Sequence, residues 1–239
     1  MTVRTLDRYS IKARIVPALI VLLPLGLALI CIFPEKFAGW DLMVWLGTSG
    51  GLAVFLEQLA RDRGKEKEVT LFEKWGGKPS TVMLRHADSP LGAITVSRYH
   101  SKLVSAVPGI KMPSKEDEQK DPGYADEVYD SCVAFLRANT RDRDKFRMIQ
   151  EENINYGFRR NLWGMKPFAI LFVGVSIILV FTQVYPNWAN PGKVKPVALV
   201  TLFLDFSFLL IWWKVVTTDW VQSAANAYAR QLLGACDQL

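Results

Sequence analysis

Apolar residues are concentrated in four blocks of this 239-residue chain, and polar segments separate the blocks. The blocks are Ile15–Phe33, Leu42–Leu59, Phe168–Val184 and Val197–Val216. Each is close to the roughly 17–25 residues that cross a hydrocarbon core of about 30 Å. Because lipid offers no partners for backbone N–H and C=O groups, each block is expected to be a helix. The pattern predicts an α-helical integral membrane protein, with four transmembrane helices in two hairpins and a mainly helical cytoplasmic domain between them.

Basic residues mark one side of the predicted membrane spans. They precede Ile15, follow Leu59, precede Phe168 and include Lys214, whereas the opposite side carries few. The positive-inside rule therefore places both termini and the central region in the cytoplasm. The first block is too long for a signal peptide and lacks a cleavage site, so we expect it to be retained. The predicted domains are an N-terminal segment (1–14), a first hairpin (15–60), a cytoplasmic ligand-binding region (61–166), a second hairpin (167–216) and a C-terminal helix (217–239).

Helix-start signals organise the central region. Asp88-Ser89-Pro90 and Asp121-Pro122 each place a polar residue before a proline, which is typical of a first helical turn. After Lys214 apolar residues recur every three to four positions, so helix is expected to continue into the tail. The further expectations are helices over Ile94–Val107, from Asp121 to Ala138 and over Asp144–Ile154, a charged loop over Met112–Gln119, and short strands at Thr70–Phe72 and Thr81–Leu84.

The residue types give little support for catalytic or metal chemistry. His86 and His100 are the two histidines, and neither an HExxH motif nor a nearby cysteine pair accompanies them. A nucleophile elbow of the GxSxG type is absent from the sequence. The stretch Gly76–Thr81 is reminiscent of a P-loop, but Pro79 occupies the position that needs Ser or Thr. We therefore expect a protein that is not an enzyme and that needs no metal or cofactor.

Cations alternate with aromatic residues and glycines between Trp75 and Lys102. Lysine and arginine pair with phosphates and aromatic faces stack on bases. Gly76-Gly77 would also let a ligand approach backbone N–H groups. The candidate ligand-binding residues are Lys74, Trp75, Lys78, Arg85, His86, Arg98, Tyr99, His100 and Lys102, together with Arg159 and Arg160 beside the third span. The alternative is a basic collar that contacts anionic lipid headgroups.

Asp205 lies near the middle of the fourth block. A carboxylate at the bilayer centre costs at least about 2.5–3.5 kcal/mol on insertion scales, which makes it a functional candidate. It would line a pore together with Thr48 and Ser49 of the second block. The alternatives are a protonated acid, an ion pair with Lys214, or a hydrogen bond to Ser or Thr on a neighbouring helix. Close helix packing equally explains the small residues of the second block.

Three segments near the paired spans carry a family resemblance: KWGGKPSTVMLRH, TVSRYHSKL and NYGFRRNLWGMKP. In these segments and in its layout the chain resembles the membrane effectors of Hailong-type antiphage defence systems, which are small four-span bacterial membrane proteins. The resemblance implies an oligomeric ion channel, expected to be a homotetramer, in the bacterial inner (plasma) membrane. It also implies a partner nucleotidyltransferase, encoded nearby, that makes short single-stranded DNA. That DNA holds such an effector closed until infection removes it.

If the resemblance extends to the ligand, residue type assigns the DNA contacts. Candidates for the phosphates are Lys74, Lys78, Arg85, Arg98 and Arg159 or Arg160, and candidates for stacking are Trp75 and Tyr99. The leading hypothesis is an oligomeric membrane channel effector that a nucleic-acid or nucleotide ligand gates. One alternative is an effector that a cyclic oligonucleotide opens. The other is a non-channel membrane scaffold with a basic lipid-contacting collar, in which Asp205 only joins helices.

Overall fold

A computed structural model describes residues 8–37, 55, 57–87 and 89–238, and no strand occurs among them. The two short strands suggested by the sequence are wrong, because the first stretch is helical and the second is the end of a helix followed by a turn. Thr70–Phe72 lies within α4 (Glu68–Lys74), and Thr81–Leu84 overlaps the end of α5 (Pro79–Val82). Pro79 is the first residue of α5, and proline favours that position because its fixed φ is already helical.

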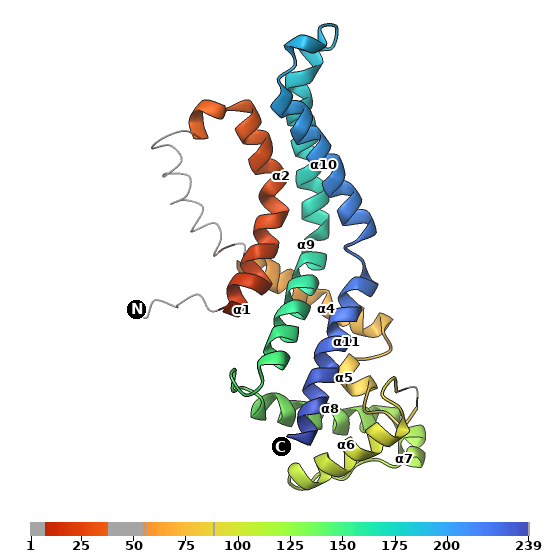
Figure 1. The fold of residues 1–239 in the computed structure, drawn as a ribbon. Coiled ribbons are helices and arrows are strands. Elements are labelled where there is room, and N and C mark those ends of the chain that lie inside the picture. The colour runs from red at the N-terminus through yellow and green to blue at the C-terminus, as the bar shows by residue number, and fades with distance from the viewer. Residues whose placement is uncertain (1–7, 38–54, 56, 88, 239) are drawn as a thin grey trace. The chain divides into compact units, whose positions relative to one another are not determined.

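Three of the described helices are long and apolar enough to cross a membrane: Arg8–Ile32, Arg147–Asn187 and Pro196–Lys214. The first consists of α1 (Arg8–Ser10), the π-helical η1 (Ile11–Ile15) and α2 (Val16–Ile32). The second is α9 (Arg147–Val184) with η3 (Tyr185–Asn187), and the third is α10 (Pro196–Lys214) (Figure 1). These helices are compatible with a membrane protein. The predicted second span falls mainly outside the described residues, and within it residues 57–59 are helical, as part of a helical stretch over 57–66.

The central helices match some start signals and not others. Helix α8 (Pro122–Asn139) begins at the predicted Asp121-Pro122, where the Asp121 side chain accepts a hydrogen bond from Tyr124 N at 3.0 Å. Helix α6 (Ala93–Ala106) instead begins after Gly92, whose φ is 77°, rather than at Asp88-Ser89-Pro90. The loop expected over Met112–Gln119 contains α7 (Lys115–Lys120). A reciprocal capping box between Ser114 and Asp117 starts this helix, because each side chain satisfies a free backbone N–H group of the other residue.

Two long helices depart from the expected boundaries. The predicted charged helix Asp144–Ile154 and the predicted third span belong to one helix, α9. The predicted C-terminal helix is confirmed as α11 (Thr218–Gly234), but it is separate from α10, so an uninterrupted continuation after Lys214 is wrong. At the break, Lys166 Nζ donates a hydrogen bond to Val216 O at 2.8 Å. The lysine thus satisfies a carbonyl that the interrupted helix leaves without an intrahelical partner.

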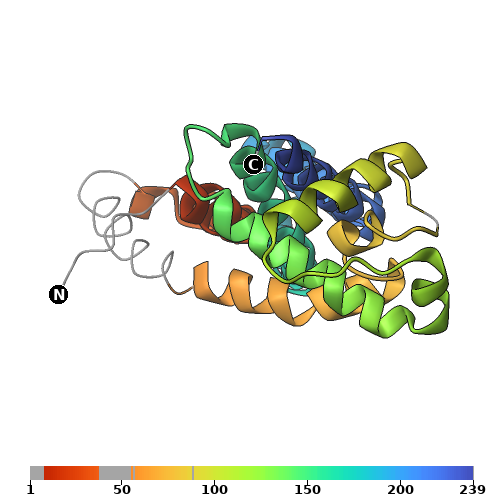
Figure 2. The same ribbon diagram turned by 90° about the horizontal axis from the view of Figure 1, so that it is seen from below.

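The chain forms two compact units, the first comprising Met1–Lys67 and Gly157–Val221 and the second Glu68–Tyr156 and Gln222–Leu239. The first unit has cores around Val173 and Trp212 and around Ala28 and Val180. The second unit has one large core, in which α6, α8 and α11 contribute Leu103, Tyr129 and Leu232. Figure 2 shows α6 and α8 side by side in this unit. The predicted domains followed the ends of the apolar blocks, whereas these compact units divide inside α9 and α11.

A close helix crossing in the first unit depends on two glycines. A Cβ atom on Gly164 of α9 would lie 2.9 Å from Gly64 N and 3.0 Å from Arg63 C. A Cβ atom on Gly64 would collide with Asn161 Oδ1. Asn161 is fully buried and donates from Nδ2 to Ala13 O at 2.7 Å. Small residues thus let the backbones approach closely enough for an amide to join three segments.

We predict that Gly164→Ala destabilises the protein although alanine is the better helix former. The new methyl group would meet backbone rather than a movable side chain, and such overpacking costs about 1–3 kcal/mol. Gly174→Ala on the same helix is the matched control, because a Cβ atom there has nothing within 4 Å. Thermal unfolding in detergent should show a lower midpoint for Gly164→Ala and an equal or higher midpoint for Gly174→Ala. Equal midpoints for both variants would contradict the close crossing.

Candidate anion-binding site

Carboxylates neutralise three of the predicted phosphate-binding cations. Lys78 forms an ion pair with Asp130. Arg85 binds Asp126 through two hydrogen bonds, Nε to Oδ1 at 2.8 Å and Nη2 to Oδ2 at 2.6 Å. Arg98 pairs with Asp237 at 3.2 Å. The residue pattern indicated the cations but not these partners, so the basic segment is less positively charged in the fold than in the sequence.

The Gly76-Gly77 turn packs closely against the guanidinium of Arg85. Both glycines have positive φ, 74° and 136°, and the Gly76 carbonyl accepts a hydrogen bond from Arg85 Nη1 at 2.9 Å. A Cβ atom on Gly77 would lie 2.9 Å from Arg85 Nη2. The two amides already donate to Glu73 O and Phe72 O. The turn therefore needs glycine for its backbone conformation and for the guanidinium, and its N–H groups are not open to a ligand as the sequence suggested.

We predict that Arg85→Gln lowers the stability of the protein by about 2 kcal/mol, since it leaves a partly buried carboxylate without its bidentate partner. The hydrogen bonding that Arg85 donates to Asp126 is the main cause that raises the pKa of Arg85, so the guanidinium remains charged. Arg98→Gln is the matched control and should cost less than about 0.5 kcal/mol, because its single contact is exposed. Denaturant unfolding checks both values. Equal losses would show that Arg85 is only a surface charge.

The two predicted histidine ligands belong to a hydrogen-bonded cluster of the second unit. His100 is buried, donates from Nε2 to Leu84 O at 2.7 Å and stacks on Tyr129. The exposed His86 contacts Pro113 O through Nε2 at 3.0 Å and lies edge-on to His100. These contacts join neighbouring segments of one fold, so they indicate a structural role for both rings.

Glu118 completes this cluster from α7. It accepts hydrogen bonds from His86 N at 2.8 Å, Ala87 N at 3.1 Å and Tyr129 Oη at 2.7 Å. Burial alone would raise the pKa of Glu118, but these donors together lower it. Burial is also the largest cause that lowers the pKa of His100, with the hydrogen bond to Leu84 acting in the opposite direction. The cluster therefore combines an ionised glutamate with a neutral histidine.

We predict that the second unit loses stability as the pH falls below about 6.5, where an unfolded histidine gains a proton. His100 has a lowered pKa in the fold, so the unfolded chain binds more protons in this window and acidification favours unfolding. His100→Gln keeps a donor for Leu84 O but does not titrate. Unfolding midpoints measured between about pH 7.5 and 5.5 should therefore change less in the variant. An identical pH dependence would contradict the assignment.

The remaining predicted residues of the second unit differ in accessibility. Tyr99 is 8% exposed, so its ring cannot stack on a base in this conformation. Trp75 is half-buried, and its Nε1 has no hydrogen-bond partner among the residues that the structure describes. Lys74 and Lys102 are exposed. Of the two predicted stacking residues, Trp75 alone keeps a partly accessible ring.

Arg159 and Arg160 lie in the first unit and contact other residues of that unit. Arg159 Nη1 donates to Trp220 O at 2.9 Å, and its guanidinium lies over the Trp220 ring at 4.8 Å. Arg160 is 8% exposed and bonds Asn161 Oδ1 from Nε and Nη2 at 3.3 and 3.2 Å. Arg159 thus joins α9 to Trp220 of α11, whereas the Arg160 guanidinium bonds the neighbouring residue of its own helix.

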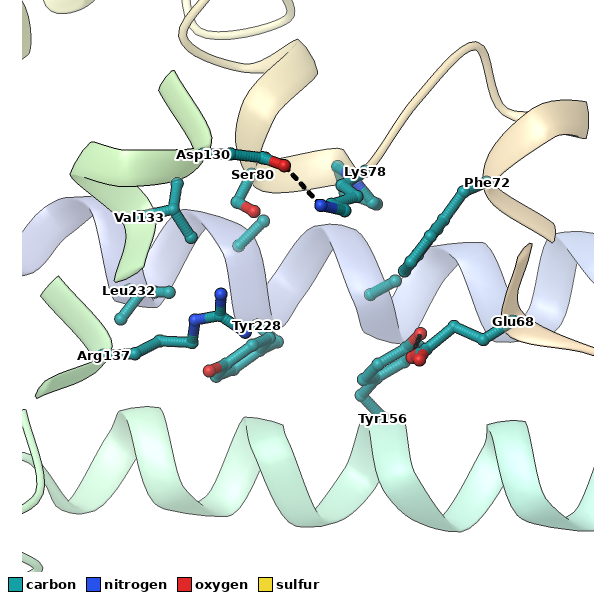
Figure 3. Close-up of a pocket in the computed structure, with 13 residues that line it drawn as sticks. Glu68, Phe72, Lys78, Ser80, Asp130, Val133, Arg137, Tyr156, Tyr228 and Leu232 are labelled. Carbon is teal, nitrogen blue, oxygen red and sulfur yellow. Dashed lines mark hydrogen bonds and ion pairs between the residues drawn. The ribbon is translucent and has the colours of Figure 1, made fainter. Parts of the chain in front are cut away.

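A cavity of about 220 Å³ in the second unit brings together residues that the sequence analysis had not selected. Tyr156 of α9 and Tyr228 of α11 lie with nearly parallel rings, 4° apart in orientation and 6.4 Å between centroids. Arg137 of α8 extends into the same cavity beside Tyr228 (Figure 3). Its full lining is Glu68, Phe72, Lys78, Pro79, Ser80, Asp130, Val133, Arg137, Tyr156, Ala225, Tyr228, Ala229 and Leu232.

Arg137 differs from Lys78, Arg85 and Arg98 in that no carboxylate among the described residues pairs with it. The other charged groups of the cavity are engaged: Lys78 pairs with Asp130, and Glu68 accepts a hydrogen bond from Tyr156 Oη at 2.6 Å. Arg137 follows Asp130 by seven residues and so lies on the same face of α8. That spacing is the one signal in the sequence that could have placed it beside Lys78.

A second, more open cavity of about 420 Å³ adjoins the first. Phe72, Lys78 and Asp130 line both, and Gly77 and Arg85 line only the second. The Lys78–Asp130 ion pair therefore lies at the boundary between the two cavities. A ligand too large for one cavity would have to pass this pair.

The predicted pore residues divide between described and undescribed parts of the chain. Thr48 and Ser49 lie outside the described residues. Asp205 is fully buried in the first unit, where its Oδ2 contacts Ser176 Oγ at 2.6 Å. The hydrogen bond to a serine on a neighbouring helix, one of the alternatives from the sequence, is confirmed.

Comparisons with known proteins add no family to this picture. No protein-family model matches the chain, and no curated protein or solved structure is significantly similar to it. Among the described residues, no group of three or more His, Cys, Asp or Glu side chains could hold a metal ion. The case for function therefore rests on the geometry of the two units.

Proposed function

We propose that this protein is an oligomeric membrane effector whose second unit binds a nucleotide or the end of a short single-stranded DNA and thereby controls permeation. The observation that supports it is the cavity in which the unpaired Arg137 lies beside the parallel rings of Tyr156 and Tyr228. A guanidinium recognises phosphate, and an aromatic ring stacks on a base. The stacking ring is that of Tyr228, which is partly exposed, whereas Tyr156 is 8% exposed and packs behind it. In this proposal the cavity binds the phosphate and the base, which the residue pattern had assigned in part to Lys78, Arg85 and Arg98.

The size of the cavity limits the ligand. Its volume of about 220 Å³ is below the range of roughly 300–1,000 Å³ that is typical of small-molecule pockets. We therefore expect it to hold one unit of a ligand rather than a whole oligonucleotide. The adjoining cavity beyond Lys78 and Asp130 would take the next unit.

Helix α9 offers a route from binding to permeation. Tyr156 contributes to the cavity, and the same helix continues through a candidate membrane span. A ligand can shift a conformational equilibrium only if it contacts two states differently. Contact with Tyr156 supplies such a difference at a helix that carries a span.

The biological setting of the proposal follows the resemblance to Hailong-type effectors. In that setting the protein is a homotetramer in the bacterial inner membrane, a nearby nucleotidyltransferase makes its ligand, and ligand loss opens the channel and disrupts the membrane. A cyclic oligonucleotide that opens the channel is the alternative ligand. Both carry phosphates and bases, so the cavity suits either, and direct competition separates them.

Two observations favour a second candidate, a non-channel membrane scaffold. Lys78, Arg85 and Arg98 are neutralised by carboxylates of the same chain. Asp205 is buried and bonded to a neighbouring helix rather than facing solvent. On this hypothesis the basic residues stabilise the fold and contact lipid headgroups, and the protein passes no ions.

We predict that Arg137→Gln weakens binding of a fluorescently labelled short single-stranded DNA by about tenfold, the loss expected for one charged hydrogen bond. Tyr228→Leu should weaken it similarly by removing a stacking face. Arg141→Gln is the matched control, because Arg141 is an exposed arginine just after α8 that does not line the cavity. Fluorescence anisotropy with the full-length protein in detergent measures the affinities.

The comparison of the two arginine variants decides the outcome. Equal weakening by Arg137→Gln and Arg141→Gln would indicate non-specific charge attraction and would remove the site. Displacement of the labelled DNA by a cyclic dinucleotide at much lower concentration than by unlabelled DNA would favour the alternative ligand. Liposomes that contain the protein and release no ions with or without DNA would favour the scaffold.

A further inference from the structure

A buried chain of polar atoms joins three candidate spans in the first unit. Asp205 of α10 contacts Ser176 of α9, with 2.6 Å between Asp205 Oδ2 and Ser176 Oγ. The same Ser176 Oγ lies 3.0 Å from Pro24 O of α2. Asp205 and Ser176 are both 0% exposed. One carboxyl group and one hydroxyl group thus connect α2, α9 and α10.

The number of available hydrogens decides the charge of this acid. A serine hydroxyl has one hydrogen to donate, and a backbone carbonyl can only accept. If Asp205 were ionised, Ser176 could serve either the carboxylate or Pro24 O, and one of the two contacts would lack a proton. If Asp205 carries a proton on Oδ2, it donates to Ser176 Oγ, which donates in turn to Pro24 O. The neutral acid alone satisfies both contacts.

The surroundings of Asp205 also oppose a charge. The described spans contain no other ionisable residue between Val16 and Ile32 except Cys31, none between Phe168 and Val184, and none on α10 except Lys214 at its end. Asp205 Oδ1 has no hydrogen-bond partner among the described residues. An ionised carboxylate here would be buried without a countercharge, and one of its two oxygens would lack a hydrogen bond. This costs far more free energy than keeping the proton.

We infer that Asp205 is a neutral carboxylic acid that latches α2, α9 and α10 together through Ser176, and that loss of its proton to water releases the latch. A released carboxylate is charged and has no countercharge paired with it among the described residues of the spans, so it must face water. The residue would then attract cations only in the open arrangement. The latch itself is independent of the proposed channel function, and only its consequence for permeation rests on that proposal.

Infrared spectroscopy of the protein in lipid tests the charge directly. Wild-type protein at neutral pH should show the carbonyl absorption of a protonated carboxylic acid, and Asp205→Asn should abolish it. Ser176→Ala keeps the acid but removes its acceptor, so the absorption should shift rather than disappear. Ser207→Ala is the matched control, because Ser207 Oγ is exposed and bonds only Phe203 O of its own helix. It should leave the spectrum unchanged.

Thermal unfolding at rising pH tests the latch. An exposed aspartate ionises above about pH 4, so the unfolded chain binds fewer protons than a fold that keeps Asp205 neutral. The wild-type midpoint should therefore fall as the pH rises above about 4, and by more than that of Asp205→Asn, which has no proton to lose. Absence of the acid absorption from the wild-type minus Asp205→Asn difference spectrum would overturn the inference. So would an equal fall in midpoint for both proteins. If the absorption and the pH effect occur but liposomes release no ions at any pH, the latch stands and the channel proposal fails.

Discussion

Polar groups inside a hydrocarbon layer find no water, so they must bond with one another. This constraint accounts for the contacts that hold the first unit together. Asp205 bonds Ser176 at the interior of the spans, and Lys166 bonds Val216 O where α10 and α11 are interrupted. Asn161 bonds Ala13 O at the crossing that two glycines permit. Apolar packing brings the helices together, and these few polar contacts select the arrangement in which they meet.

In the second unit, carboxylates of α8 make the polar contacts that hold neighbouring segments in place. Asp126 and Asp130 lie one turn apart and hold Arg85 and Lys78. Because these carboxylates occupy the cations, the segment that looks strongly basic in the sequence is locally neutral in the fold. Arg137 lies seven residues after Asp130 on the same helix and has no such partner among the described residues, which is why the proposed ligand contact is assigned to it. Lys78, held by Asp130, lines the same cavity.

Local signals explain how much of the fold the sequence predicted. Apolar blocks identified three described spans, and Asp121-Pro122 marked the start of α8. The missed α7 has a capping box, Ser114 and Asp117, that is also local and could have been used. The predicted strands failed because short apolar runs do not distinguish strand from helix without their neighbours. The join of the charged helix to the third span needed the structure, since the apolar block that marks this span begins only at Phe168.

The candidate site depended almost entirely on contacts between distant residues. Arg85 and Asp126 are 41 positions apart, and Ser176 and Pro24 are 152 apart. Hydropathy and residue type determined, from the sequence alone, that the chain has apolar helices, a basic segment and one acid within a span. Only the tertiary structure decided which cations are neutralised and which helices Asp205 joins. The physical reason is that periodicity describes one helix at a time, whereas charge compensation and burial are properties of neighbours that the chain brings together by folding.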